Sequence, residues 1–197
     1  ATFTTSNNKL PRYGFKKGNY IVDILHLSKF FEEKNKDERF INLPSSLKSC
    51  LKNWKENFEK FKELDKALIN ENIDSTTKEG FRIAQLESEL NFLAPVPNPQ
   101  SFRDFYAFEQ HVRSARKLRG LDMHPDWFRI PIFYFSNAAA IYGHGATIPY
   151  PFETKELDFE LEFAVIIANG GSNINQKDAN NYIAGYTVCN DWSARDL

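Results

Sequence analysis

The sequence predicts an α+β fold that is rich in β-structure. Aromatic residues make up 15% of the 197 residues, with 18 phenylalanines, and strands favour aromatic side chains. One stretch, residues 45–69, places its apolar side chains at three- and four-residue steps with Lys and Glu between them, which is the pattern of an amphipathic helix. Several shorter segments have the composition and the turn boundaries of strands.

The N-terminal part is predicted to contain a small sheet and this helix. We expect residues 1–10 to form a loose polar arm. The helix at 45–69 follows Pro44, so Ser45 or Ser46 is its expected N-cap. The predicted strands are residues 12–15, 20–25 and 82–86, with a turn at 16–19.

The prolines at positions 95, 97 and 99 predict a domain boundary, because proline fits neither a helix interior nor a central strand. We therefore expect a small N-terminal domain, residues 1–93, with the helix inserted in it. Residues 94–197 form a second domain that carries the chemistry. Its predicted elements are helices at 101–119 and 178–182 and strands at 130–135, 157–167 and 184–190.

Composition argues against several classes of protein. The net charge of −1 indicates no nucleic-acid partner and no anionic membrane surface. No apolar run approaches the about 20 residues of a membrane-spanning helix, and the polar N-terminus lacks the apolar centre of a signal peptide. Cys50 and Cys189 match neither a metal motif nor a disulfide framework, so we expect a reducing, cytoplasmic setting.

Two glutamates near residue 160 are the strongest chemical signal. Glu160 and Glu162 alternate with Phe159, Leu161 and Phe163, and an apolar run follows. On a strand, residues i and i+2 point to one face, so the two carboxylates would stand side by side in a buried segment. Burying two like charges costs several kcal/mol each unless something compensates them. A divalent cation does so, since hard cations take carboxylate oxygens, although a Glu-x-Glu strand by itself is more often a solvated face.

Two further segments carry candidate acids. Asp104 precedes His111 by seven residues, about two turns of a helix, so the predicted helix would place both on one face. Asp191 follows the predicted strand 184–190. The structural alternatives are a helix first-turn acid for Asp104, a helix-face histidine for His111 and a turn residue for Asp191.

Three motifs occur in a characteristic order. They are Arg103-Asp104-Phe105-Tyr106…Gln110-His111, then Leu157-Asp158-Phe159-Glu160-Leu161-Glu162, then Asn190-Asp191-Trp192-Ser193-Ala194-Arg195-Asp196. Together they resemble the fumarylacetoacetate hydrolase family over residues 94–197, and residues 12–30 resemble its small N-terminal domain. The helix at 45–69 matches no motif of that family. The resemblance implies that residues 94–197 are part of a mixed β-roll catalytic domain.

The resemblance also implies an active site. A divalent metal, Mg²⁺ or Ca²⁺ with Mn²⁺ as an alternative, would be held by four carboxylates. His111 would be the general base that activates water, and Arg195 would bind carbonyl or carboxylate oxygens of the substrate. Tyr106 and Tyr134 would line the substrate pocket. The implied metal ligands are Asp104, Glu160, Glu162 and Asp191.

The implied activity is hydrolysis of a carbon–carbon bond in a small fumarylacetoacetate-like or acylpyruvate substrate, as in aromatic catabolism, by a homodimer. Two alternatives stay open: decarboxylation, isomerisation or dehydration of a 2-oxo acid, and a non-catalytic metal-binding scaffold. Individual residues also have structural alternatives. Arg195 could pair with Asp196 or Asp191, and the two tyrosines could be core aromatics. His26, His124 and His144 are interpreted as structural or exposed.

In the resembled family the catalytic domain continues beyond the position of Leu197. We therefore expect residues 1–197 alone to be inactive and poorly soluble, because the edge of the strand at 184–190 would be exposed. A turnover assay on the purified 197-residue protein tests this expectation. Turnover of an acylpyruvate by that protein would contradict it.

Overall fold

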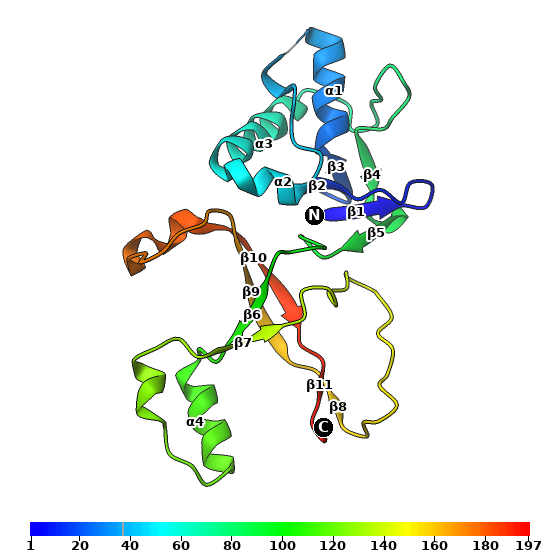
Figure 1. The fold of residues 1–197 in the computed structure, drawn as a ribbon. Helices are drawn as coiled ribbons and strands as arrows, with labels where there is room; N and C mark the ends of the chain where they lie inside the picture. Colours follow the sequence, from blue (N-terminus) through cyan, green and yellow to red (C-terminus); the bar gives the residue numbers. More distant parts are fainter. Residues whose placement is uncertain (37) are drawn as a thin grey trace. The chain divides into compact units, whose positions relative to one another are not determined.

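The computed structural model describes residues 1–36 and 38–197 (Figure 1). The chain forms two compact units, residues 1–96 with 142–197, and residues 97–141, and we describe each by itself. Helices and antiparallel strands are both present, which confirms the α+β class. The division into domains at residue 93 stays a prediction.

A five-stranded antiparallel sheet organises residues 2–93. Its strands, in spatial order, are β4 (Ala84–Leu86), β3 (Tyr20–Asp23), β2 (Arg12–Lys17), β1 (Thr2–Thr5) and β5 (Leu90–Leu93). The strands predicted at 12–15, 20–25 and 82–86 are confirmed, with β3 ending at Asp23.

The predicted loose arm at residues 1–10 is wrong. Its first part is β1, which lies between β2 and β5, and Phe3 in it is fully buried. Threonine is β-branched and suits a strand, so the Thr-rich sequence is polar in composition but well adapted to a sheet. The partners that bury it, β2 and β5, come later in the chain.

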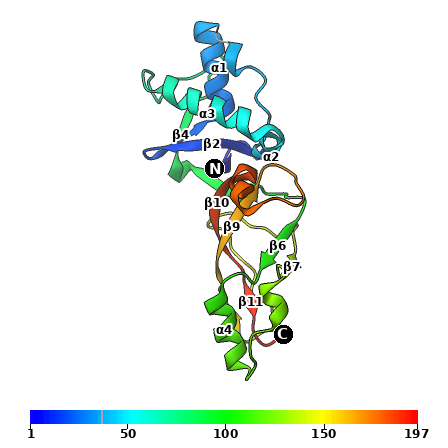
Figure 2. The same ribbon diagram turned by 90° about the vertical axis from the view of Figure 1, so that its left-hand side faces the viewer.

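Three helices pack on this sheet and share its core. They are α1 (Ile24–Asn35), α2 (Leu47–Cys50) and α3 (Trp54–Leu68), and Figure 2 shows them on one side of the sheet. The predicted 45–69 helix is confirmed in position, but the 3₁₀ turn η2 (Leu51–Asn53) divides it. Ser46 is its N-cap, since its hydroxyl accepts from the backbone N–H of Ser49 at 3.2 Å. Shorter 3₁₀ turns are η1 (Glu38–Phe40) and η3 (Glu87–Glu89).

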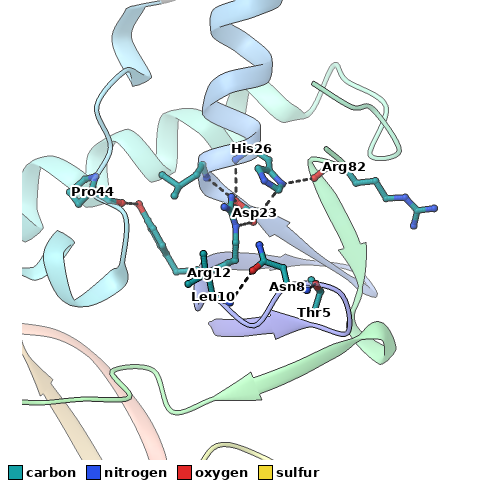
Figure 3. A network of polar contacts seen from close by, with 10 residues as sticks. Thr5, Asn8, Leu10, Arg12, Asp23, His26, Pro44 and Arg82 are labelled. Carbon is teal, nitrogen blue, oxygen red and sulfur yellow. Dashed lines mark hydrogen bonds and ion pairs between the residues drawn. The ribbon is translucent and has the colours of Figure 1, made fainter. Parts of the chain in front are cut away.

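Helix α1 was not predicted, and it depends on one buried carboxylate (Figure 3). Asp23 is fully buried, and its Oδ1 accepts from the backbone N–H groups of Leu25 (3.0 Å) and His26 (3.1 Å). The guanidinium of Arg12 donates two hydrogen bonds to the same carboxylate, from Nε to Oδ2 at 2.5 Å and from Nη2 to Oδ1 at 2.6 Å. The Nδ1 atom of His26 lies 3.0 Å from the carbonyl oxygen of Arg82, and burial lowers the pKa of His26. His26 therefore has a structural role.

Asp23→Ala removes the helix cap and leaves Arg12 without its partner. We expect the free energy of unfolding to fall by about 3–5 kcal/mol, because breaking a largely buried ion pair strands the remaining charge. Chemical denaturation measures this. Asp65→Ala is the matched control, since the side chains of Asp65 and Lys17 are 45% and 42% exposed and such a pair contributes at most about 1 kcal/mol. Equal losses in the two variants would contradict the proposed role.

In the second unit, two paired strands enclose a helix in the chain order. Strand β6 (Phe102–Phe105) comes first, followed by α4 (Glu109–Leu118), the 3₁₀ turn η4 (Pro125–Phe128) and strand β7 (Phe133–Ser136), which pairs antiparallel with β6. The predicted helix 101–119 is wrong in its first half, because residues 102–105 pair with β7 instead. Asp104 and His111 therefore do not share a helix face. The strand predicted at 130–135 is present but begins at Phe133.

The C-terminal segment forms two short antiparallel ribbons. Strand β9 (Leu161–Ile167) pairs with β10 (Ile183–Asn190), and β8 (Leu157–Asp158) pairs with β11 (Ser193–Ala194). The strand predicted at 184–190 is confirmed, and the helix predicted at 178–182 is the 3₁₀ helix η5 (Gln176–Tyr182). The predicted burial of the glutamate segment is wrong, because Leu161 and Phe163 are 75% and 59% exposed on the two-stranded ribbon. Within the described part of the chain, no helix is long and apolar enough to cross a membrane.

Candidate active site

Three of the predicted carboxylates share one face of the β9–β10 ribbon. Glu162 pairs with Cys189, and the backbone N–H of Asp191 donates to the carbonyl oxygen of Glu160 at 2.9 Å. Residues opposite each other in an antiparallel pair project to the same side, as do residues two apart on one strand. The register thus places Glu160, Glu162 and Asp191 on the same side of the ribbon, although Glu160 lies between β8 and β9 rather than inside one continuous strand.

Arg195 lies against this acidic face. Its Nη1 donates to Oε1 of Glu160 at 2.5 Å, while Nη2 and Nε donate to Oδ2 of Asp158 at 3.0 and 3.2 Å. The hydrogen bonds that Arg195 donates to Glu160 and then to Asp158 raise the pKa of Arg195. In return, the Arg195 guanidinium and then the N–H of Phe159 hold the pKa of Asp158 below its ordinary value.

Residues 193–196, which include Arg195, are hydrogen-bonded to residues 154–158. Ser193 pairs with Asp158, and the N–H of Arg195 donates to the carbonyl oxygen of Glu156 at 3.0 Å. One residue further, the carboxylate of Asp196 accepts from the hydroxyl of Thr154 and from the N–H of Lys155. These contacts lower the pKa of Asp196, and they fix the segment 193–196 beside residues 154–158.

In the unit of residues 97–141, the predicted residues form two contacting pairs. Asp104 and Tyr134 are opposite each other in the antiparallel pair of β6 and β7, and the Tyr134 hydroxyl donates to Oδ2 of Asp104 at 2.7 Å. The rings of Tyr106 and His111 meet edge to face, with centroids 5.7 Å apart. The Trp127 indole N–H donates to the carbonyl oxygen of Tyr106 at 2.7 Å, which anchors the segment between strand and helix.

His111 is reached from solvent. It lines an open hollow of about 450 Å³ whose other lining residues are Phe108, Glu109, Gln110 and Ser114. A separate hollow of about 480 Å³ contains none of the predicted site residues, and its lining is Asn169, Ser172, Asn173, Ile174, Asn175, Asp178, Asn181 and Tyr182. The hollow beside His111 can admit the water that a general base would activate.

The eight predicted residues therefore fall into two local sets, one in each compact unit. The first set is Glu160, Glu162, Asp191 and Arg195. The second set is Asp104, Tyr106, His111 and Tyr134. Sequence reasoning missed Asp158 as a partner of Arg195, and the available signal was that Asp158 lies inside the second motif. The alternative pairing of Arg195 with Asp196 is not what the structure shows, because Asp196 accepts from Thr154 and Lys155 instead.

The chemistry of the donors fits a hard divalent cation, since the ribbon collects carboxylates on one face. Over residues 1–36 and 38–197, no three His, Cys, Asp or Glu side chains are close enough together to hold an ion. One carboxylate, that of Glu160, bonds instead to the cationic guanidinium of Arg195.

Comparison with known proteins identifies the family. A family model described as the C-terminal domain of fumarylacetoacetate (FAA) hydrolase matches residues 100–197. Through this half of its length, the chain belongs to the fumarylacetoacetate hydrolase family. The match contains all eight predicted site residues of this family member.

Curated relatives of two kinds match the chain. Fumarylacetoacetase of Oryza sativa subsp. japonica is 32% identical over 130 residues, covering 56% of this chain and 30% of that protein. Oxaloacetate tautomerase fahd2, mitochondrial, of Xenopus laevis is 33% identical over 116 residues, covering 55% of this chain and 33% of that protein. Fumarylacetoacetase of Dictyostelium discoideum is 27% identical over 225 residues, covering 99% of this chain and 52% of that protein.

A solved structure has the same fold. It is the crystal structure of an HpcE protein from Mycobacterium smegmatis, with a TM-score of 0.60 and 19% sequence identity, covering 100% of this chain and 56% of that chain. At this identity the likeness concerns the fold alone. The chain spans between about a third and a half of the length of the relatives described here.

The contact between Arg195 and Asp158 predicts a titration. The pKa of the Asp158 carboxyl should lie below its ordinary value of 3.8, so the ion pair is present above that pH and is lost as the pH falls through the lowered pKa. Arg195→Gln should raise the pKa of Asp158 toward the ordinary value. Side-chain carboxyl NMR over a pH series measures both. An unchanged pKa in Arg195→Gln would contradict the contact.

Proposed function

We propose that the protein is a metal-dependent hydrolase that cleaves a carbon–carbon bond in a fumarylacetoacetate-like or acylpyruvate 1,3-dicarbonyl substrate. The observation that carries the proposal is the extent of the match to the Dictyostelium fumarylacetoacetase, which covers 99% of the chain, including the N-terminal sheet. The matches to the oxaloacetate tautomerases of Xenopus and rat cover 55%.

Four carboxylates would hold the divalent cation, which is Mg²⁺ or Ca²⁺ in this proposal, with Mn²⁺ as an alternative. When bound, the cation would supply Lewis-acid polarisation of the substrate's carbonyl groups. Supporting this, three of the carboxylates share one face of the β9–β10 ribbon. The proposed ligands are Asp104, Glu160, Glu162 and Asp191.

His111 is the proposed general base. Its imidazole takes a proton from water, and the water oxygen forms a bond to one carbonyl carbon of the substrate. The bond from that carbon to the central carbon then breaks, and the central carbon keeps the electron pair and takes up a proton. The edge contact with Tyr106 restricts the ring of His111, and the open hollow beside it gives water access.

Arg195 is the proposed contact for the substrate's carboxylate, because a guanidinium offers a planar fork of donors that fits such a group. Tyr106 and Tyr134 are the proposed lining of the pocket. The hydroxyl of Tyr134 also orients Asp104, to which it donates at 2.7 Å.

A second candidate is isomerisation of a 2-oxo acid at the same site. The oxaloacetate tautomerases among the relatives, at 33% and 34% identity, favour it, and such a reaction needs no attacking water. Decarboxylation and dehydration of a 2-oxo acid belong to this same alternative, and a non-catalytic metal-binding scaffold is a third. A homodimer and a cytoplasmic location are part of the proposal, although some relatives carry mitochondrial names.

Metal removal and two substitutions test the hydrolase. Full-length protein with Mg²⁺ should hydrolyse acetylpyruvate, and EDTA should abolish the activity. His111→Ala should lower kcat by about 100-fold or more, which is the usual contribution of a general base. Glu162→Gln should weaken Mg²⁺ binding, measured by calorimetry, because a charged ligand is lost.

Glu153→Gln is the matched control, since Glu153 is exposed and outside the proposed site. Full hydrolytic rate in His111→Ala would overturn the role of the base, and unchanged Mg²⁺ affinity in Glu162→Gln would overturn the metal site. Wild-type protein that interconverts the keto and enol forms of oxaloacetate without hydrolysing acetylpyruvate would favour the second candidate.

A further inference from the structure

Asp158 is a fixed carboxylate beside the proposed site. Its Oδ1 accepts from the backbone N–H of Phe159 at 2.9 Å. Its Oδ2 accepts from both Nε and Nη2 of Arg195, at 3.2 and 3.0 Å. Because both oxygens are engaged, the carboxylate is held in one orientation and can in turn orient the guanidinium.

The backbone ties the two residues together independently of any other unit. Asp158 pairs with Ser193 in the β8–β11 ribbon, and the N–H of Arg195 donates to the carbonyl oxygen of Glu156 at 3.0 Å. The carboxylate of Asp196 adds a further contact between the two segments, because it accepts from the N–H of Lys155 at 2.8 Å. The distance between the main chains at Asp158 and Arg195 is thus set by local pairing.

The three nitrogens of the guanidinium are divided between two carboxylates. Asp158 takes Nε and Nη2, while Nη1 donates to Glu160 at 2.5 Å. Glu160 is a proposed metal ligand, and a carboxylate oxygen that binds a cation is a poorer acceptor for a guanidinium. Metal binding at Glu160 would therefore leave Nη1 available, while the two contacts to Asp158 keep the side chain in place.

We propose that Asp158 is a positioning residue, which holds Arg195 so that Nη1 presents to the carboxylate of a 2-oxo acid substrate. This inference rests on the proposed function, and it assigns a task to a residue outside the predicted ligand set. Asp158 itself does not touch the substrate. It acts through Arg195. When Nε and Nη2 of the planar guanidinium are fixed by Asp158, Nη1 is held in the orientation in which it can recognise a substrate carboxylate.

A role in stability does not account for the pair. The side chains of Arg195 and Asp158 are 44% and 49% exposed, and ion pairs at such positions contribute little to folding. Asp158→Asn should therefore fold normally, with an unchanged unfolding midpoint. It keeps an oxygen for the Phe159 N–H but loses the charge that holds the guanidinium.

The test uses full-length protein with Mg²⁺ and two probes, acetylpyruvate for turnover and oxalate for binding. Asp158→Asn should raise KM for acetylpyruvate by about tenfold and weaken oxalate binding, measured by calorimetry, by a similar factor, as expected for a lost charge-assisted contact. The value of kcat and the Kd of Mg²⁺ should each change by less than about threefold, since His111 and the proposed ligands are intact. Glu153→Gln is the control that removes one nearby exposed carboxylate and should alter neither probe.

A double-mutant cycle shows whether Asp158 acts through Arg195. Arg195→Lys should raise KM by itself, and adding Asp158→Asn should raise it no further, because the fork that Asp158 holds is already gone. Independent, multiplying effects would overturn the proposal, as would wild-type KM and oxalate affinity in Asp158→Asn. A loss of Mg²⁺ affinity larger than the change in KM would assign Asp158 to the metal instead.

Failure of this inference can be told apart from failure of the proposed function. Wild-type protein that binds oxalate but does not hydrolyse acetylpyruvate would refute the hydrolase, and oxalate binding by the variants would still decide the role of Asp158. Wild-type protein that hydrolyses acetylpyruvate while Asp158→Asn matches it in every measurement would refute only the positioning role. Wild-type protein that does neither would refute both.

Discussion

The candidate site depends on the antiparallel register between residues 157–167 and 183–194. Two motifs about thirty residues apart in sequence meet in this pairing, and the register decides which side chains share a face. It places Glu160 opposite Asp191 and leaves Glu162 on the same side. A shift of one residue would send one motif's side chains to the opposite face. The positions of three carboxylates therefore follow from backbone hydrogen bonds.

Concentrating carboxylates on one face has an electrostatic consequence. Like charges at this spacing repel one another unless a cation lies among them. In this structure the guanidinium of Arg195 compensates part of this negative charge through its ion pairs with Glu160 and Asp158. The residue proposed to bind substrate is thus also part of the local charge balance, so in the proposed site one side chain would link metal binding to substrate binding.

The five-stranded sheet of residues 2–93 contains a comparable arginine–carboxylate pair in a buried setting. Asp23 is fully buried, yet two backbone N–H groups and the guanidinium of Arg12 satisfy its carboxylate. This one side chain joins β2 to the start of α1, because Arg12 lies on the strand and Asp23 caps the helix. In both places an arginine fork and a carboxylate fix the relation between neighbouring elements. Burial makes the first pair important for stability, while exposure leaves the second pair free to serve a site.

The sequence by itself determined the α+β class, most strands, the position of the 45–69 helix and the family of residues 100–197. These follow from local spacing and from short motifs, which need no knowledge of distant partners. Tertiary structure alone decided that residues 2–5 are a central strand and that residues 102–105 pair with 133–136 instead of extending a helix. The spacing of Phe102, Phe105 and Phe108 suits a helix, and only the partner strand thirty residues away overrides it. Tertiary structure also decided that Arg195 bonds to Asp158 and Glu160, because hydrogen bonds between segments depend on register, which no single segment contains.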